Sequence, residues 1–502
     1  MYNVLEWLEA DEANLPDKVS FADVNTHISY AELAQKARRA GTFIAQNAAP
    51  RQPIALYMDK TVDAICALLG AAYAGCCYSF IDLRQPQARI SKIVGKLSPA
   101  FVVVDDAALD DAREAFPTDL QLVTVSELFA SEVDAKLLAE RRAGALSTDP
   151  LYINFTSGTT GTPKGVTVGH ASVISFIPTF CKTLGLTGND VFANQAPLDF
   201  DVSVKDVFGS LALGATVHLI PRDYFSIPTQ LLDYLVERKP TVLVWAVSAM
   251  CFVSIMRGFD YAVPDTVRLV AFSGEVMPPK QLARWQAALP NATFVNLYGP
   301  TEITCNCTYH VIDRTYARGE VIPMGKPFAG ENVFLIDDAG SLVPESEAGH
   351  PGEIYVGGPE LALGYYNDPE RTAEAFVQNP LHDEHRDIVY KTGDLAQYDE
   401  DGNLVYLSRV DHQIKHMGQR IELGEIEAAA QAADGVERAC CIYDHSRQRI
   451  RLYYTGTREK DELSAALHEA LPPFMMPNTV KQLDDMPLTK NGKIDRAALA
   501  EQ

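Results

Sequence analysis

The sequence has no long hydrophobic run and no excess of positive charge. No uninterrupted apolar segment approaches the roughly 18 residues that a membrane-spanning helix needs. The first residues, MYNVLEWLEADEANLPDKVSF, carry acidic side chains and lack the basic start and apolar centre of a secretory signal peptide. The formal net charge of -23 disfavours nucleic acid or an anionic membrane as the main partner. We therefore expect a cytoplasmic protein that neither inserts into membranes nor binds nucleic acid.

The C-x-x-C spacing that is typical of zinc sites is also missing. The nine cysteines include no C-x-x-C pair and lie mostly in apolar segments, so we expect buried reduced thiols. The 502 residues are 47% hydrophobic and 22% charged. This composition is ordinary for a globular enzyme, and the length allows more than one domain.

Helix-like and strand-like segments alternate in the first part of the chain. Residues 30–46 have helical spacing, residues 53–58 form a short apolar run, and residues 62–75 read as a buried helix. Such alternation predicts an α/β fold with parallel sheets and covering helices. From about residue 411 the pattern changes to that of a smaller α+β domain.

A loop rich in glycine and hydroxyl groups follows an apolar segment that begins at Leu151. The stretch 151–169 reads LYINFTSGTTGTPKGVTVG, and its apolar start predicts a buried strand. Glycines let backbone amides approach an anion, hydroxyls add donors, and Lys164 adds a mobile positive charge. The spacing is not that of a Walker loop, because Lys164 follows proline and precedes glycine. We interpret the loop as a phosphate cradle, with a plain polar surface loop as the alternative.

This loop resembles the signature of the adenylate-forming superfamily, which includes acyl-CoA synthetases, luciferases and amino-acid adenylation enzymes. Further motifs of that superfamily follow in order: FDxS at 200–203, SGE at 273–275, NLYGPTE at 296–302, YKTGDL at 390–395, SRVD at 408–411 and PLTKNGKIDRAAL at 487–499. The resemblance spans nearly the whole chain. It implies a large ATP- and substrate-binding domain over residues 1–408, a hinge at 409–411 and a small mobile lid domain over 412–502. Ser408 departs from the usual glycine of the hinge motif.

The resemblance implies ATP and Mg²⁺ as cofactors and assigns nucleotide binding to several motifs. The residues implied for phosphate binding are Thr156, Ser157, Gly158, Thr159, Thr160, Gly161 and Lys164. Those implied for adenine and ribose are Gly274, Glu275, Asn296, Leu297, Tyr298, Asp394 and Arg409. Those implied for catalysis are Lys493, Glu302 and Thr301, with Glu302 as the magnesium ligand. The chemistry agrees: a tyrosine ring stacks on adenine, one carboxylate accepts from both ribose hydroxyls, and Mg²⁺ prefers carboxylate and phosphate oxygens.

Asp201 points to an amino acid as the substrate. In amino-acid-activating members of the superfamily the aspartate of FDxS binds the α-ammonium group, and a carboxylate within an apolar pocket would select a cation. The alternative is that Asp201 caps the following helix. Lys205 stands where many relatives carry an apolar residue, and it could pair with Asp201, face an acidic substrate side chain or point away. The remaining residues expected in the pocket are Val202, Trp245, Ala271, Ser273, Leu297, Cys305 and Asn306.

The resemblance thus implies a ligase that activates a small amino acid as aminoacyl-AMP and transfers it to a phosphopantetheine thiol. D-alanine, L-alanine or serine is favoured, with an acidic amino acid left open, and the chain is most similar in kind to D-alanyl carrier protein ligase and to adenylation domains of nonribosomal peptide synthetases. Only nine residues follow Lys493, so we expect a separate carrier protein. For the transfer step the resemblance implies rotation about Asp411, close approach of Gly418 and gating by Phe200. We expect a monomer.

Two alternatives to this function stay open. The first is an acyl- or aryl-CoA ligase, which Asp201 disfavours. The second is a non-catalytic adenylate-binding regulator, which the combination of Lys493, Glu302 and Asp394 disfavours. We expect structural and not catalytic roles for two further residues. His170 lies at a helix start, and Arg89 lies in a stretch for which we expect helix capping and packing contacts.

Overall fold

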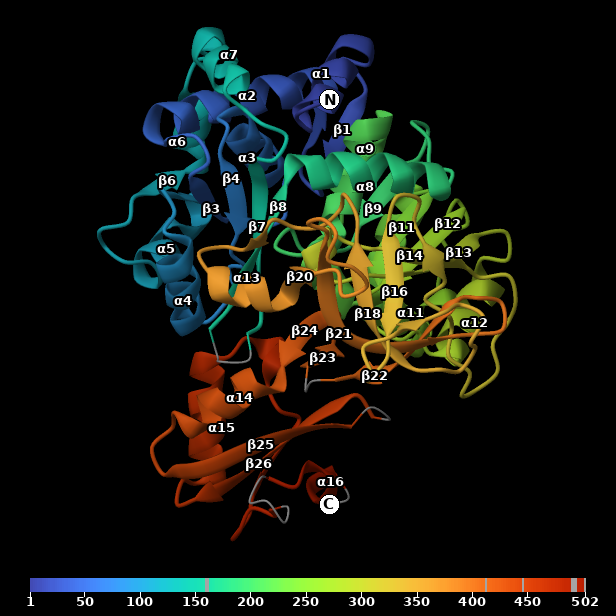
Figure 1. The fold of residues 1–502 in the computed structure, drawn as a ribbon. Coiled ribbons are helices and arrows are strands. Elements are labelled where there is room, and N and C mark those ends of the chain that lie inside the picture. Colours follow the sequence, from blue (N-terminus) through green and yellow to red (C-terminus); the bar gives the residue numbers. More distant parts are fainter. Residues whose placement is uncertain (159–161, 411–412, 445–446, 489–493, 501–502) are drawn as a thin grey trace.

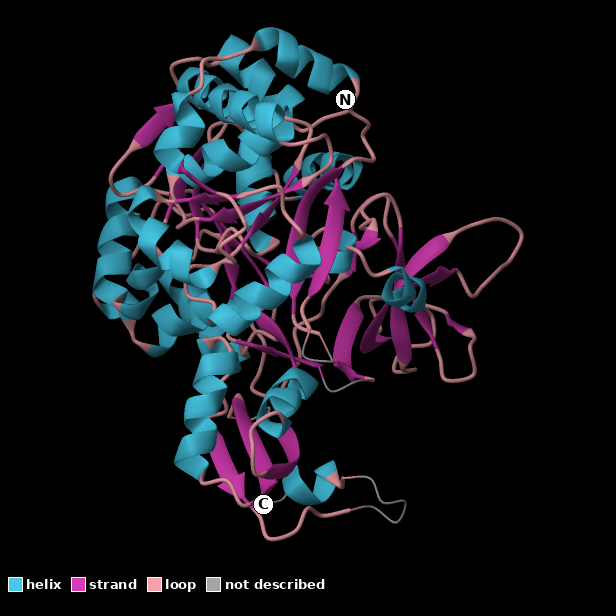
Figure 2. Ribbon diagram, turned by 90° about the vertical axis from the view of Figure 1, so that its left-hand side faces the viewer, coloured by secondary structure: helices cyan, strands magenta, loops and turns pink. Residues whose placement is uncertain are grey.

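The computed structural model describes residues 1–158, 162–410, 413–444, 447–488 and 494–500, without the side chain of Ala497 (Figure 1). Within these residues a large α/β domain carries three sheets, and a smaller C-terminal domain lies below it in Figure 1. Figure 2 shows the small domain as a distinct body at one end of the molecule. The expected α/β class with a small C-terminal domain is confirmed, while the exact domain boundaries stay a prediction.

The first sheet contains the strand that begins near Leu151. In spatial order its strands are β19 (Gly364–Tyr365), β8 (Lys164–Gly169), β7 (Pro150–Thr156), β4 (Cys77–Phe80), β3 (Pro53–Tyr57), β5 (Val102–Val104) and β6 (Leu122–Thr124). The strands from β7 to β6 run parallel, whereas β8 returns antiparallel to β7. The glycine-rich loop is therefore the turn of a hairpin between β7 and β8.

The second sheet carries most of the motifs that follow the loop. Its strands in order are β15 (Lys326–Pro327), β14 (Thr308–Val311), β13 (Thr293–Tyr298), β12 (Leu269–Ser273), β11 (Val242–Ala246), β9 (Val191–Asn194), β10 (Thr216–Leu219), β1 (Val19–Ala22) and β2 (His27–Ser29). The strands from β13 to β1 are parallel. Because neighbouring parallel strands end at the same edge, the motifs after β12 and β13 lie side by side.

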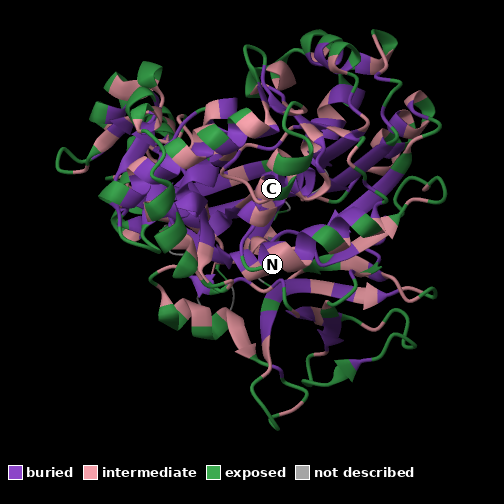
Figure 3. Cartoon of the chain, turned by 90° about the horizontal axis from the view of Figure 1, so that it is seen from above, coloured by how far each residue is buried: buried purple, intermediate pink, exposed green. Residues whose placement is uncertain are grey.

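Helices cover both faces of these sheets. The helices of the large domain are α1 (Leu5–Asn14), α2 (Tyr30–Asn47), α3 (Val62–Tyr73), α4 (Gln87–Leu97), α5 (Leu109–Ala115), α6 (Val125–Ala130), α7 (Ala135–Ala143), α8 (His170–Thr183), α9 (Val202–Leu213), α10 (Pro228–Arg238), α11 (Val247–Ile255), α12 (Pro279–Ala288) and α13 (Pro369–Ala375). Helices α2, α3, α8 and α9 share one apolar core with residues of both sheets. The buried strands form the centre of the molecule and the exposed residues its rim (Figure 3).

Local signals explain where several helices begin and end. Ser29 and Glu32 form a reciprocal capping box at the start of α2, and Thr61 caps α3. Helix α9 ends at Gly214, whose φ of 66° is in the left-handed region. The spans expected at 30–46, 53–58 and 62–75 correspond to α2, β3 and α3.

The third sheet is antiparallel and leads into the small domain. Its strands are β17 (Leu342–Val343), β16 (Asn332–Ile336), β18 (Gly352–Gly357), β21 (Ile388–Tyr398) and β20 (Phe376–Gln378), with β22 (Leu404–Arg409) also paired to β21. After β22 comes the hairpin of β23 (Gln413–His416) and β24 (Gln419–Glu422). The rest of the small domain contains α14 (Leu423–Gln431), β25 (Val436–Asp444), β26 (Arg449–Gly456), α15 (Lys460–Ala470), β27 (Thr479–Gln482) and α16 (Arg496–Ala500).

All nine cysteines lie within the described residues and are free thiols. Eight are buried, and Cys251 on α11 is half-buried. Among the described helices none combines the length and the apolar character that crossing a membrane would require.

Candidate active site

Glu302 lies at the centre of the candidate site, in a short helical turn directly after β13. Its carboxylate is fully buried and has a cation on each side: Lys164 Nζ lies 3.2 Å from Oε1, and Arg420 Nη1 lies 2.6 Å from Oε2. The hydroxyl of Tyr365 also donates to Oε1 at 2.8 Å. Burial opposes ionisation of Glu302, but Arg420 and then Lys164 outweigh it and hold the pKa well below its usual range. The carboxylate is therefore an anion shared between the two domains.

Lys164 connects the glycine-rich loop to this carboxylate. It is the first residue of β8, and its side chain is almost completely buried. Burial and the nearby charge of Arg420 lower the pKa of Lys164 to about 8. Ser157, on the other side of the loop, donates to the backbone carbonyl of Arg420 at 2.7 Å and accepts from the amide of Glu422. The described part of the loop thus contacts the β23–β24 hairpin directly.

Asp394 forms a second acidic centre on β21. Arg409 Nη1 lies 2.6 Å from its Oδ1, and the hydroxyl of Tyr298 donates to its Oδ2 at 2.5 Å. The pairing of β21 with β22 places Arg409 opposite Asp394, which explains the ion pair. Lys415 Nζ from the hairpin lies 5.4 Å from the centroid of the Tyr298 ring. A buried aromatic ring beside a carboxylate suits a nucleoside.

Asp201 does not cap the helix that follows it. Helix α9 begins at Val202, and the Asp201 side chain makes no capping hydrogen bond. Burial raises the pKa of Asp201, opposed by a hydrogen bond from Thr301. Asp201 lines a cavity between the domains together with Arg89, Ser157, Phe200, Thr301 and Arg420. Asp201 is therefore part of the lining of a cavity that a ligand could enter.

Among the described residues Lys205 pairs with an amide and forms no ion pair with Asp201, while a role toward an acidic substrate side chain stays a prediction. It is fully buried on α9, and its Nζ donates to the amide oxygen Oδ1 of Asn306 at 2.6 Å. Burial lowers the pKa of Lys205. Cys305, next to Asn306, donates from Sγ to the backbone carbonyl of Asp201 at 3.1 Å. Lys205, Asn306 and Cys305 thus form a compact polar group one helical turn beyond Asp201.

The expected pocket residues that lie on strands of the second sheet share one face of that sheet, with one exception. Ala271 and Leu297 share the large core with Cys305, and Ser273 lies on the same face of β12 as Ala271. Trp245 was expected in the pocket, and this is wrong. Strand residues alternate between faces, and Trp245 packs on the opposite face, against Trp285, with its ring N–H donating to the carbonyl of Ala193.

Other expected nucleotide residues also have partners within the protein. The side-chain amide of Asn296 donates to the carbonyl of Pro323 at 2.8 Å. Gly274 has a φ of 98°, which favours glycine. Glu275 accepts from the amide of Gly418 at 3.2 Å, and burial raises its pKa.

The β23–β24 hairpin brings residues into the site that sequence reasoning did not identify. Arg420 contacts Glu302, and Lys415 lies over the ring of Tyr298. Outside the hairpin, buried Arg89 forms an ion pair with Glu425 of α14. Arg89 therefore does more than the capping and packing expected of it. Gly418 of this hairpin was expected to approach the site closely, but the partners of Lys415 and Arg420 lie more than a hundred positions away, where no local pattern reveals them.

Five expected residues lie outside the described residues: Thr159, Thr160, Gly161, Asp411 and Lys493. Next to Lys493, Ile494 pairs with Leu488 and packs with Met486 against Cys440 and Tyr453 of β25 and β26. This cluster lies on the face of the small sheet opposite the core formed with α14 and α15.

The residues present fit the ATP and Mg²⁺ that the superfamily uses. Asp394 and Tyr298 offer a buried carboxylate and ring for a nucleoside. Glu302 offers an ionised carboxylate, the kind of ligand that Mg²⁺ prefers, although Arg420 neutralises it while the hairpin is docked. Withdrawal of the hairpin would free one oxygen of Glu302 for a cation.

This fold and site define an adenylate-forming enzyme. The family model of AMP-binding enzymes matches residues 8–366, and that of the AMP-binding enzyme C-terminal domain matches residues 425–493. The chain belongs to the AMP-binding enzyme family.

Comparisons with individual proteins agree with this assignment. The chain is 33% identical to bacitracin synthase 1 of Bacillus licheniformis over 99% of its own length, but it spans only 9% of that protein. Among solved structures it is similar to holo-PA1221, a nonribosomal peptide synthetase protein containing adenylation and PCP domains, with a TM-score of 0.82, 27% identity and coverage of 99% of this chain and 84% of that one. It shares its fold with o-succinylbenzoate CoA synthetase of Bacillus subtilis, with a TM-score of 0.85, 20% identity and coverage of 99% and 96%. The chain thus resembles nonribosomal peptide synthetase adenylation domains.

Proposed function

We propose that the protein activates a small amino acid with ATP and transfers the aminoacyl group to the phosphopantetheine thiol of a separate carrier protein. The observation that carries the proposal is the Asp201 carboxylate, which caps no helix and lines the cavity between the domains. An anion there would pair with the α-ammonium group of an amino acid. A fatty or aryl acid has no such cation.

In the first half-reaction, a carboxylate oxygen of the amino acid attacks the α-phosphorus of ATP, and the bond to pyrophosphate breaks. Lys164 and the loop around it would hold the departing phosphates, and Asp394 would accept hydrogen bonds from the ribose hydroxyls. Mg²⁺ bound at Glu302 would neutralise phosphate charge. Lys493 is proposed to stabilise the charge that develops between the carboxylate and the phosphorus.

In the second half-reaction, the thiol sulfur attacks the acyl carbon, the C–O bond to AMP breaks, and the thiol proton is released. The docked hairpin supports this step. Arg420 lies beside Glu302, where Mg²⁺ would bind in the first half-reaction. Gly418, at the turn of the hairpin, lies against β11 and α11. We propose that the small domain rotates between two positions about Asp411, with domain limits at residues 408 and 412.

The pocket supports a small substrate. Lys205 and Asn306 are already hydrogen-bonded to each other, and both are buried. A large side chain would have to displace this pair and would leave buried polar groups without partners. We therefore favour D-alanine, L-alanine or serine.

The test is exchange of labelled pyrophosphate into ATP, measured with all common L- and D-amino acids and with short fatty and aryl acids. We expect one small amino acid to drive exchange. The Asp201→Asn variant should exchange pyrophosphate at least about a hundredfold more slowly, because the ammonium group of the substrate loses its counter-ion. The exposed Asp223→Asn is the matched control and should retain full exchange. Lys493→Ala should abolish exchange.

The alternatives predict different results. Exchange driven only by fatty or aryl acids, unaffected by Asp201→Asn, would establish an acyl- or aryl-CoA ligase. ATP binding without any exchange would support a regulatory protein. Transfer to the carrier thiol is tested separately by thioester formation with pantetheine.

A further inference from the structure

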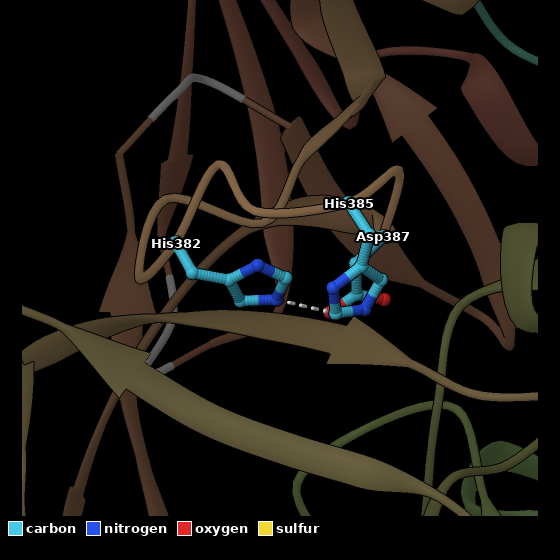
Figure 4. A group of neighbouring side chains, drawn as sticks. All are labelled: His382, His385 and Asp387. Carbon is cyan, nitrogen blue, oxygen red and sulfur yellow. Dashed lines mark hydrogen bonds and ion pairs between the residues drawn. The ribbon is translucent and has the colours of Figure 1, made fainter.

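A second cluster of chemically active side chains lies in the loop between β20 and β21, outside the site described above. His382, His385 and Asp387 each offer one ligand atom, and these atoms all lie within 4.8 Å of one another. Figure 4 shows the His382 ring directed at Asp387, with the His385 ring beside the same carboxylate. The proposed adenylation chemistry uses none of the three residues.

The loop that carries these residues is held in shape by two amide side chains. Gln378 Nε2 donates to the backbone carbonyls of His382 at 3.2 Å and of His385 at 3.0 Å, while its Oε1 accepts from the amide of Asp387. Buried Asn379 donates from Nδ2 to Oδ2 of Asp387 at 2.8 Å. The backbone at all three positions is therefore fixed before any ligand binds, which lowers the cost of binding.

The side chains are already close to the geometry of a metal site. Nε2 of His382 lies 3.1 Å from Oδ2 of Asp387, and the two imidazole rings are stacked with centroids 4.6 Å apart. Ligands bound to zinc at about 2.0–2.1 Å lie roughly 3.3 Å apart in a tetrahedron, so rotation of the imidazole side chains from their stacked arrangement would bring the ligand atoms to that spacing.

We propose that His382, His385 and Asp387 bind one divalent transition-metal ion of the zinc class. Two imidazoles and one carboxylate are a ligand set that Zn²⁺ accepts, with water in the fourth position. Mg²⁺ and Ca²⁺ prefer oxygen ligands and do not suit this set. The adjacent exposed side chains of Asp383 and Glu384 add negative charge that attracts a cation.

The site would join the two ends of a loop that leads directly into β21, the strand that carries Asp394. The bound ion would cross-link residues 382 and 387 and restrict this loop. The inference does not depend on the substrate or on the adenylation chemistry, since neither involves these side chains.

The experiment is titration of the EDTA-treated full-length protein with Zn²⁺ by calorimetry, without ATP, beside His385→Gln and Asp387→Asn variants. His350→Gln is the matched control, because His350 is also at least partly accessible and contacts a carboxylate, Glu347. We expect one Zn²⁺ per chain, at least tenfold weaker binding in both site variants, and unchanged binding in the control. Mg²⁺ should not compete.

Cobalt(II) substitution distinguishes this site from the cysteines. We expect d–d absorption without the thiolate-to-cobalt charge-transfer band that a cysteine ligand produces, and loss of that absorption in His385→Gln. Because His385 is exposed, this variant should keep the wild-type circular dichroism spectrum and thermal midpoint in EDTA. Equal Zn²⁺ affinity in the wild type and both site variants, or no binding in the wild type, would overturn the proposal.

Discussion

At the scale of single residues, the most unusual feature is the ammonium group of Lys205 in the interior of the large domain. Burying a charge is costly unless it has a partner, and its hydrogen bond to Asn306 supplies one. The hydrogen bond fixes Lys205 beside Asn306, which was also expected in the pocket.

Replacement of Lys205 tests its influence on specificity. Lys205→Met leaves the buried Asn306 oxygen without its donor, which costs about 1–3 kcal/mol of folding free energy, and we expect kcat/KM for the preferred amino acid to fall. We expect the variant to activate apolar amino acids better relative to the preferred one. The measurement is pyrophosphate exchange across the amino-acid panel. An unchanged order of preference among the amino acids would contradict an influence of Lys205 on specificity.

A second prediction concerns acid stability and His170. This residue is buried at the start of α8, and its Nδ1 accepts from the amide of Val4. Burial lowers the pKa of His170 to about 4. Because the unfolded chain then binds more protons, stability falls as the pH drops below about 6.5, by about 2 kcal/mol at pH 5.

His170→Gln should remove this loss while keeping an acceptor for the Val4 amide. Urea unfolding at pH 7.5 and pH 5.0 measures the difference, and we expect the variant to lose about 2 kcal/mol less than the wild type between them. His350→Gln, at a partly exposed position, should behave as the wild type. Identical pH dependence in all three proteins would show that His170 is not buried in its neutral form.

At the scale of elements, the β23–β24 hairpin joins the small domain to the candidate active site. Gly418 lies at the hairpin turn with a φ of 76°, and a Cβ there would come within 3.2 Å of Ser248 Oγ and 3.3 Å of Ala246 Cβ. The close approach requires glycine for both backbone and space.

Gly418→Val should therefore impair the docked arrangement and spare the first half-reaction. We expect thioester formation with pantetheine to fall at least about tenfold while pyrophosphate exchange stays within about threefold, because only one step needs the hairpin docked. Gly340→Val is the control: its φ of 80° imposes similar strain, but a Cβ there meets open space. Equal loss of both activities in Gly418→Val would contradict the prediction.

The sequence predicted the elements better than the contacts between them. Periodicity identified α2, β3 and α3 because each carries its own apolar pattern. It could not tell which face of β11 Trp245 occupies, since every residue of that strand is buried. Arg420 and Arg89 escaped notice for a different reason: their roles come from partners in the other domain, which no local pattern specifies.

At the scale of the whole molecule, the two domains meet through charged groups. Arg89 from α4 and Glu425 from α14 form a buried ion pair, each with 5% of its side chain exposed. Removing one member of a buried pair is strongly destabilising, whereas exchanging both preserves the attraction.

A charge exchange tests whether this contact holds the docked arrangement. Arg89→Glu and Glu425→Arg should each reduce thioester formation by at least about tenfold, and the double variant should recover a large part of it. Pyrophosphate exchange serves as the reference activity for all three proteins. Losses in the double variant equal to the product of the single losses would show that the two side chains do not interact in solution.

The burial of the cysteines gives this protein a practical advantage. Burial raises the pKa of Cys251, the half-buried thiol, to about 12, so almost none of it is thiolate at neutral pH. Cysteines introduced at the exposed positions Glu374 and Glu469 would then take up fluorescent dyes selectively against the native thiols. Single-molecule energy transfer between the two domains could therefore be measured without first removing the native cysteines, because they would not be labelled.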